Sequence, residues 1–470
     1  MQKSRLFELF SAFSKTEKRE LGKFVHSPVF NQRQDVAALY QYFYENAGAK
    51  DPQTFARKTV FAALFPAEKY SAAKMDYTMS FLFRVLKSYL VFKEQTSNAA
   101  ANQIALARAL RKRNLGRLFD KEYKIAERLL EKSPFRDAGY HFDKYQLLLE
   151  EISITKQGSR NLAGSFSEFS SELTTYFIAK KLWQACSAVM YKTVWKAEVE
   201  EEDILEAILN HVQANDYSGV PAVNLYYHCY KALTETDSLR WFEALRNLTR
   251  SHFASLRAAE VRDLYLVAIN YCIRRFNNGE KDFLKEAFNL YKEGLQLGTF
   301  LENNMLSRFT YNNIVMAGLL LKEFIWVKQF LSDYREYIEP RFRESTYNYN
   351  LAIYYYQKPD YGKAMTLLQQ ADFDDVMHNL NARRILLKIY FEENELEALA
   401  SHITSFKNYI YRRKELGSYH RELYLNFLKY TQRILALGKY DKKAAASLKK
   451  EIEKVEPVAE KGWLLQVLGK

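Results

Sequence analysis

Histidine and cysteine carry much of the chemistry of protein sites, and this chain has few of either. The three cysteines, Cys186, Cys229 and Cys272, form no C-x-x-C pair. His228 and Cys229 are adjacent, but neighbouring side chains on a helix point about 100° apart and cannot share a metal unaided. The eight histidines are scattered, with no two of them four residues apart, at His26, His141, His211, His228, His252, His378, His402 and His420. The sequence therefore predicts no metal site.

Motifs for catalysis or cofactor binding are also missing from the sequence. The chain contains no phosphate-binding loop of the G-x-x-x-x-G-K-[ST] or G-x-G-x-x-G type. It contains neither H-E-x-x-H nor G-x-S-x-G. Catalytic carboxylates cannot be singled out among 56 acidic residues. We therefore expect a protein with no enzymatic activity and no cofactor.

A basic cluster is the clearest candidate for binding an anionic partner. It spans several turns of one expected helix, with positions 108 and 112, and 113 and 117, four residues apart. The simpler interpretation is a solvated helix face, and the alternative is a patch for an anionic partner. The residues are Arg108, Arg111, Lys112, Arg113 and Arg117.

The distribution of charge argues against a continuous nucleic-acid channel. Residues 1–95 hold 15 Lys and Arg against 9 Asp and Glu, and residues 401–470 hold 15 against 7. Because the net charge of the whole chain is +13, the middle of the chain is close to neutral. We expect nucleic-acid binding to be weak and to disappear near physiological salt.

The elements that must position any site are expected to be helices throughout. The chain has 16 Gly and 8 Pro, where average usage would give roughly 56 of the two together. Few positions therefore require positive φ or break a helix. The 34 Tyr and 32 Phe recur at helical spacing, as expected for side chains between packed helices. We predict an all-α fold.

Residues 1–95 are expected to form an N-terminal helical module. Ser14 and Glu17 fit a capping box at the start of one helix. Asn31 is a candidate cap for a helix over 32–46, and Ser71 for the long helix that follows it. Another helix is expected near 55–64. The pattern F-S-x-x-E followed by S-P-x-F-N resembles a group of uncharacterised bacterial helical proteins, from which no activity can be transferred.

Helical hairpins repeat from about residue 96 to 437, most clearly at 347–370. There Asn348, Leu351, Ala352, Tyr355, Ala364 and Leu368 fall on the repeat pattern W-x2-L-G-x2-Y…A-x3-F, with Asn348 in place of Trp. This segment resembles a tetratricopeptide repeat, and the resemblance is strongest over 310–410. Further back, the three cysteines are 43 residues apart, and we interpret each as a small buried residue of a longer repeat. The resemblance implies a right-handed stack of antiparallel helical hairpins, a degenerate tetratricopeptide-like α-solenoid.

The same resemblance implies a concave groove lined by the first helix of each hairpin. On that basis Asn312, Tyr349, Arg384 and Lys388 would face the groove, and the alternative is that they are ordinary surface residues. The family's carboxylate clamp is not reproduced, because Ile385 stands where its arginine would be.

The C-terminal segment 438–470 is expected to cap the stack. Its apolar positions Leu448 and Ile452 form a narrow stripe, and Trp463 and Leu464 can fold back as a last short helix. Repeat stacks need such a unit, since an exposed seam would aggregate. The alternative is a detached basic tail.

Location and function follow as expectations. The longest run without Asp, Glu, Lys or Arg is the 14 residues 217–230, too short to span a bilayer. With no secretory signal pattern we expect a cytoplasmic protein without a membrane partner. The predicted function is a non-enzymatic scaffold that binds a protein or peptide partner in its groove. The alternative is a nucleic-acid-associated or regulatory protein that uses the basic ends.

Overall fold

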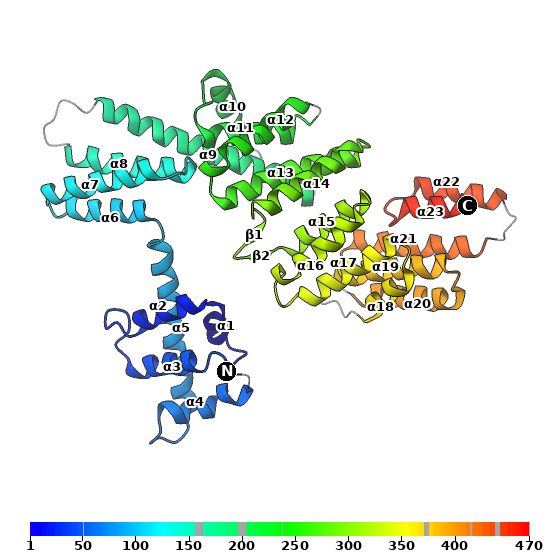
Figure 1. Cartoon of the computed structure of the whole chain (residues 1–470), viewed down its shortest axis with the longest axis horizontal. Helices are drawn as coiled ribbons and strands as arrows, with labels where there is room; N and C mark the ends of the chain where they lie inside the picture. Colours follow the sequence, from blue (N-terminus) through cyan, green and yellow to red (C-terminus); the bar gives the residue numbers. More distant parts are fainter. Residues whose placement is uncertain are drawn as a thin grey trace. The chain divides into compact units, whose positions relative to one another are not determined.

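The computed structural model describes residues 1–49, 51–155, 163–195, 204–236, 238–370, 376–413, 416–437 and 442–469. Within these ranges the chain forms 23 α-helices, three short 3-10 helices and one two-stranded hairpin (Figure 1). The all-α prediction is therefore confirmed. The chain divides into two compact units, Met1–Gln184 with Glu201–Tyr226, and Ala185–Glu200 with Tyr227–Lys470. The division falls within helices α9 (Ala163–Trp195) and α11 (Pro221–Thr234), and each unit is described by itself below.

The first unit begins with five helices around one aromatic core. The core includes Phe10, Phe43, Phe61 and Leu86, each at most 2% exposed. The long helix α5 contacts α1, α2, α3 and α4, so it forms the centre of this module. The helices are α1 (Arg5–Ala12), α2 (Lys15–Val25), α3 (Gln34–Glu45), α4 (Arg57–Leu64) and α5 (Ala72–Gln95), with a 3-10 turn at Pro52–Phe55.

Two of the three predicted caps in this module are confirmed. Glu17 N–H donates to Ser14 Oγ at 3.2 Å, and Ser14 N–H donates to Glu17 Oε2 at 2.9 Å, which completes the capping box. Ser71 Oγ accepts from the backbone of α5. The prediction for Asn31 was wrong, because α3 begins at Gln34 and Arg33 is its N-cap residue. The Asn31 side chain instead bonds the backbone on both sides of its loop.

A second group of helices in the first unit follows the module. Helices α6, α7 and α8 contact one another around Ile104, Ala126, Leu130 and Leu147. Helix α9 continues the chain into the second unit, and α10 returns to the first. The bounds are α6 (Ala99–Arg111), α7 (Gly116–Lys132), α8 (Ala138–Thr155), α9 (Ala163–Trp195), α10 (Ile204–Ala214) and α11 (Pro221–Thr234).

The second unit is a succession of helices in which each contacts the next from α12 to α21, after which α21 contacts α23 and α22 contacts α23. Helix α15 also contacts α17, and α17 also contacts α19, so the first helices of successive pairs lie against one another. The bounds are α12 (Leu239–His252), α13 (Ala258–Asn277), α14 (Asp282–Gln296), α15 (Arg308–Leu320), α16 (Phe324–Asp333), α17 (Arg343–Gln357), α18 (Tyr361–Gln370), α19 (Val376–Glu392), α20 (Leu396–Arg412), α21 (Ser418–Leu435), α22 (Lys442–Lys454) and α23 (Lys461–Leu468). Short 3-10 turns occur at Phe253–Ser255 and Arg335–Tyr337.

The first helix of several pairs ends in the same way. Asn114, Gly279, Lys322 and Asn394 each have positive φ two or three residues after the last residue of such a helix. The next N–H then donates to the carbonyl five residues earlier, as in Glu323 to Gly318 at 2.9 Å. The equivalent bonds after α6, α13 and α19 are 2.9–3.1 Å long. This is the Schellman arrangement, which satisfies carbonyls at a helix end and reverses the chain within two or three residues.

The hairpin predicted at 347–370 consists of α17 and α18, which pack closely on each other. Ala352 and Ala364 are both 0% exposed and Leu368 is 4% exposed, so the predicted small residues lie in the interior. The three cysteines are buried in α9, α11 and α13, as predicted, and none of them forms a disulfide. Burial raises the pKa of the Cys272 thiol to about 12 and keeps it unreactive.

Two short strands interrupt the helices between α14 and α15. Strands β1 (Leu301–Glu302) and β2 (Met305–Leu306) are antiparallel, with Leu301 opposite Leu306. Asn303 and Asn304 both have positive φ, as a two-residue type I′ turn requires.

The described part of the C-terminal segment packs against the helices before it. Leu448, Ile452, Trp463 and Leu464 belong to a core cluster that includes Phe427 of α21. The backbone of this segment is also bonded, since Ala459 N–H donates to Leu423 O at 3.1 Å. The segment is therefore part of the second unit.

Candidate functional site

The four residues predicted to face a groove lie on three first helices of the second unit. Asn312 is on α15, Tyr349 on α17, and Arg384 and Lys388 are one turn apart on α19. Since α17 contacts both neighbours, these residues occupy adjacent positions across the three helices. We refer to Asn312, Tyr349, Arg384 and Lys388 as the groove surface.

An amide and imidazole network joins the three helices at one end of the groove surface. Asn350 Nδ2 donates to Asn312 Oδ1 at 2.6 Å, and Asn312 Nδ2 lies 3.0 Å from His378 Nε2. Because an amide NH2 can only donate, His378 Nε2 accepts here and the ring proton lies on Nδ1. Tyr349 stacks on the His378 ring at a centroid distance of 4.8 Å. Tyr349 is only 6% exposed, so it offers a ligand little surface.

Two cations at the other end of the groove surface share one carboxylate. Arg384 Nη1 is 2.6 Å from Glu460 Oε1, and Lys388 Nζ is 2.8 Å from Glu460 Oε2. Burial alone would raise the pKa of Glu460, but the positive charges of Arg384 and Lys388 lower it below its usual value. Glu460 has φ 53°, a conformation that is uncommon for a residue with a side chain. It lies just before α23, so the C-terminal segment supplies this carboxylate.

Aromatic rings enclose Lys388 on two sides. Its Nζ is 5.2 Å from the Tyr356 ring centroid and 5.7 Å from that of Trp463. Trp463 Nε1 donates to Glu392 at 3.0 Å, and Glu392 also accepts from Tyr356 and Tyr361. The Lys388 side chain is therefore only 12% exposed. An external ligand can reach this cation only if Glu460 or Trp463 moves.

Glu460 was not predicted from the sequence, although its carboxylate pairs with both cations of the groove surface. It lies 72 residues beyond Lys388, in a connection between two short helices. No local pattern marks a contact of that kind. His378 and Asn350 were missed for the same reason.

The basic cluster is not the single helix face that was predicted. Helix α6 ends at Arg111, Asn114 has φ 57°, and α7 begins at Gly116. Positions 113 and 117 therefore do not lie one turn apart on one helix. The interruption follows from R-N-L-G, in which asparagine tolerates positive φ and ends the first helix.

Two members of the cluster are occupied by ion pairs within the first unit. Arg108 Nε is 2.5 Å from Glu150 Oε1, and Arg111 Nε is 2.7 Å from Glu150 Oε2. Because the Glu150 side chain is only 2% exposed, these arginines neutralise a buried carboxylate. The exposed members of the cluster are Lys112, Arg113 and Arg117.

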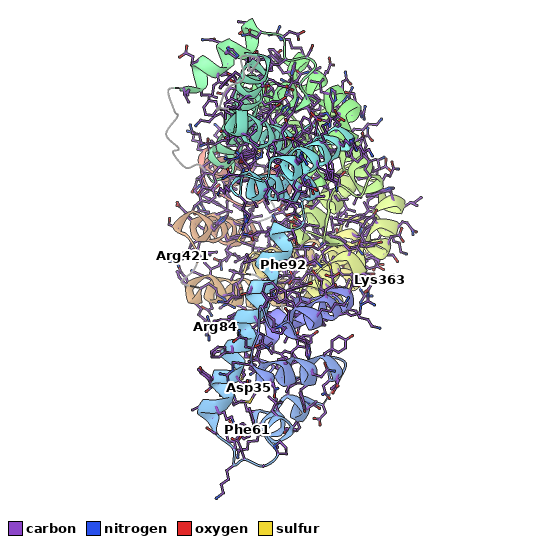
Figure 2. The ribbon with its side chains drawn as sticks, turned by 90° about the vertical axis from the view of Figure 1, so that its left-hand side faces the viewer. Asp35, Phe61, Arg84, Phe92, Lys363 and Arg421 are labelled. Atoms are coloured by element: carbon purple, nitrogen blue, oxygen red, sulfur yellow. The ribbon has the colours of Figure 1, made fainter. Side chains whose placement is uncertain are left out.

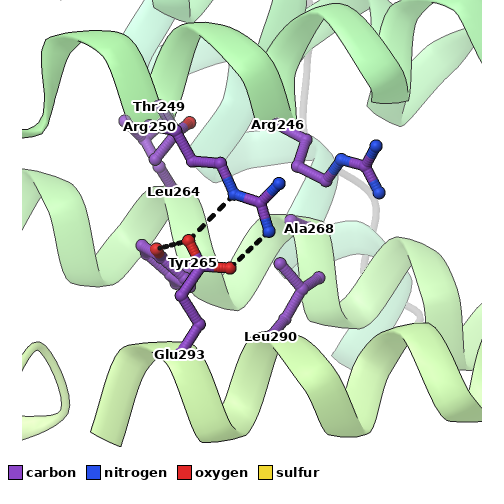
Figure 3. A pocket seen from close by; sticks show the side chains of 8 residues that line it. All are labelled: Arg246, Thr249, Arg250, Leu264, Tyr265, Ala268, Leu290 and Glu293. Carbon is purple, nitrogen blue, oxygen red and sulfur yellow. Dashed lines mark hydrogen bonds and ion pairs between the residues drawn. The ribbon is translucent and has the colours of Figure 1, made fainter. Parts of the chain in front are cut away.

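A small cavity between α12, α13 and α14 was not predicted from the sequence (Figure 3). Arg250 Nε donates to Glu293 Oε1 at 2.9 Å, and Tyr265 OH donates to the same oxygen at 2.8 Å. Hydrogen bonds from Arg250 and Tyr265 lower the pKa of Glu293 despite its partial burial. The cavity holds about 10 Å³, which is room for at most one water. Its charged groups therefore join helices rather than bind a ligand.

Within the described ranges, no group of three His, Cys, Asp or Glu side chains could hold a metal ion. No helix in that part of the chain is both long and apolar enough to cross a membrane. No protein-family model, curated protein or solved structure matches the chain.

Proposed function

We propose that this chain is a non-enzymatic scaffold of the degenerate tetratricopeptide-like α-solenoid type, which binds a protein or peptide partner at the groove surface. The proposal rests on one observation above all. Residues chosen from the repeat pattern alone, Asn312, Tyr349, Arg384 and Lys388, come from successive first helices that contact one another. A stack of hairpins would present such residues side by side.

Two further observations support a repeated architecture. First helices in both units end in the same Schellman arrangement, so the same turn recurs along the chain. The small residues Ala352 and Ala364 are buried between the two helices of a pair. The three buried cysteines form no disulfide, which is compatible with the reducing cytoplasm that we propose as the location.

The ion pairs at Glu460 indicate what chemistry a partner needs at this surface. Arg384 and Lys388 already hold a carboxylate, and the Arg384 side chain remains 26% exposed. A partner with an Asp or Glu side chain, or a free C-terminus, would compete for the same two cations. Binding would therefore be opposed by Glu460 and would strengthen when that carboxylate is removed.

Co-purification from the native host tests this proposal with three baits, namely the wild-type protein and two variants. Glu460→Gln leaves both cations without their carboxylate, whereas a triple variant with Arg384→Gln, Lys388→Gln and Glu460→Gln removes all three charges at similar volume. The recovered partner should increase severalfold with Glu460→Gln and fall below wild type with the triple variant. Melting curves must show that both variants fold. Equal recovery of every co-purifying protein with all three baits would contradict the proposal.

A further inference from the structure

A cleft opens in the first unit between α2, the loop 27–31 and the end of α5. Phe24 and Tyr89 form its floor, Phe30 and Phe92 its walls, and Lys23 and Glu20 part of its rim. Figure 2 shows Phe92 and Phe61 towards opposite ends of the N-terminal module. The cleft has a volume of about 520 Å³, within the range of roughly 300–1,000 Å³ typical of ligand-binding pockets.

The walls of the cleft are aromatic and open to solvent. Phe30 is 44% exposed and Phe92 is 45% exposed, whereas Phe24 and Tyr89 below them are buried. Phe24 stacks on Phe30 at a centroid distance of 3.8 Å, and Phe92 lies 5.6 Å from Phe24 and 5.9 Å from Phe30. Exposed rings grouped in a concave site are typical of interaction surfaces.

The loop that carries Phe30 is held in place by Asn31. Its Nδ2 donates to Val25 O at 2.9 Å and to Arg33 O at 3.0 Å, and its Oδ1 accepts from Arg33 N–H at 3.0 Å. Val29 in this loop is 83% exposed. The loop thus presents apolar side chains to solvent from a fixed backbone, which reduces the entropy lost when a partner binds.

A row of cations on α2 leads to the cleft. Lys15, Arg19 and Lys23 are four residues apart and all exposed. In the described part of the chain these three make no ion pair, whereas Lys93 across the cleft is paired with Glu20 at 2.8 Å. Like charges at this spacing on one helix repel each other and destabilise the helix. The carboxylates of an acidic partner would offset this repulsion.

We propose that this cleft docks an acidic segment of a partner protein. The segment packs one large apolar side chain against the exposed parts of the Phe30 and Phe92 rings and sets its carboxylates against Lys15, Arg19 and Lys23. This is the helix-in-groove mode of recognition, in which apolar anchors give affinity and charges give orientation. The cleft belongs to the first unit and is a different surface from the groove surface, so the inference does not depend on the function proposed above.

The contacts in the cleft favour a peptide over single-stranded nucleic acid, which also uses aromatic rings and cations. Phe24 and Phe30 cover each other's faces at 3.8 Å, which leaves one face fewer on each ring for stacking with a base. A concave site with a charged row on one side suits an amphipathic segment.

Selection from a random dodecapeptide library on the full-length protein tests the inference. The selected peptides should combine Leu, Phe or Trp with Asp or Glu. Titration calorimetry of one such peptide should show at least a tenfold loss of affinity with Phe92→Ser and with Lys23→Glu. Changing the acidic residue of the peptide to Lys should restore binding to the Lys23→Glu protein.

Neighbouring residues provide matched controls. Val91 is 56% exposed and adjoins Phe92 but does not line the cleft, so Val91→Ser should leave affinity unchanged. Lys58 is exposed on α4, outside the cleft, and Lys58→Glu should also have no effect. Peptides that bind Phe92→Ser as tightly as wild type would overturn the inference. The inference would also be overturned if no peptide is selected and a fluorescent twelve-nucleotide oligothymidine binds the wild-type protein but not Lys23→Glu.

Discussion

Replacing Gly318 by alanine tests whether α15 and α16 approach as closely as a helical hairpin with a small residue at its seam requires. A Cβ on Gly318 would lie 2.5 Å from Val327 Cγ2 and 3.1 Å from Phe288 Cε2, well inside normal contact. Val327 is fully buried, and a valine in a helix has essentially one χ1 rotamer, so the methyl group cannot turn away. The helices must separate instead.

The expected size of the effect comes from two opposing terms. Overpacking of a core costs about 1–3 kcal/mol, and a contact of 2.5 Å with an immobile partner belongs at the upper end. Alanine in place of a glycine within a helix stabilises the helix by about 1 kcal/mol. We therefore expect Gly318→Ala to lower the free energy of unfolding by about 2 kcal/mol.

Gly362 is the matched control, because it is also helical and its added Cβ would meet nothing within 4 Å. Gly362→Ala should raise the free energy of unfolding by about 0.5 kcal/mol. Urea unfolding followed by circular dichroism at 222 nm gives the two midpoints. Hydrogen exchange of the α15 and α16 amides should be faster in Gly318→Ala than in the wild type. This local measurement is needed because a chain of many helices can unfold in parts. Equal midpoints for the two variants, or a more stable Gly318→Ala protein, would refute the close approach.

Three other predictions follow from the same structure. Ala364→Glu would bury a charge without a partner and should cost about 3–5 kcal/mol, whereas Lys363→Glu on the exposed face should change the melting temperature little; equal losses would contradict the hairpin. Burial lowers the pKa of His402, so below the ordinary histidine value of about 6.5 the unfolded chain binds a proton that the folded chain does not. Stability should then fall as pH decreases through that value, and His402→Gln should weaken the dependence; a variant with the same pH dependence as wild type would exclude this residue as its source. The dissociation constant for nucleic acid at physiological salt should be above the micromolar range. A sub-micromolar dissociation constant that is lost when Lys112, Arg113 and Arg117 are changed to Glu would favour the alternative function.

Local sequence patterns predicted helix ends and small buried residues well. The Ser14 and Glu17 capping box and the Ser71 cap need only a few neighbouring residues, so they can be identified without a fold. Ala352 and Ala364 could be placed because helical spacing and the repeat resemblance agreed on them. The error at Asn31 was also local, since the same side chain can cap a helix or fix a loop.

Contacts between distant parts of the chain could not be predicted from the same patterns. Arg108 meets Glu150 42 residues away, and Lys388 meets Glu460 72 residues away. One sequence does not say which of many carboxylates will reach a given cation, because that choice depends on how helices pack. The basic cluster therefore looked like a free surface, although two of its arginines are paired within the fold.

Site-specific photo-crosslinking tests the central proposal most directly. Met316 is one turn from Asn312 on α15 and is 37% exposed, whereas Ile325 is 90% exposed on the second helix α16. A photoreactive amino acid is introduced at one position or the other in the native host. Crosslinking from position 316 reports a partner near the groove surface, and crosslinking from position 325 reports a partner at the second helices. If the chain is a groove-binding scaffold, a partner crosslinks from position 316, more strongly with Glu460→Gln, and not from position 325. Crosslinking of the same partner from position 325 alone would contradict the account.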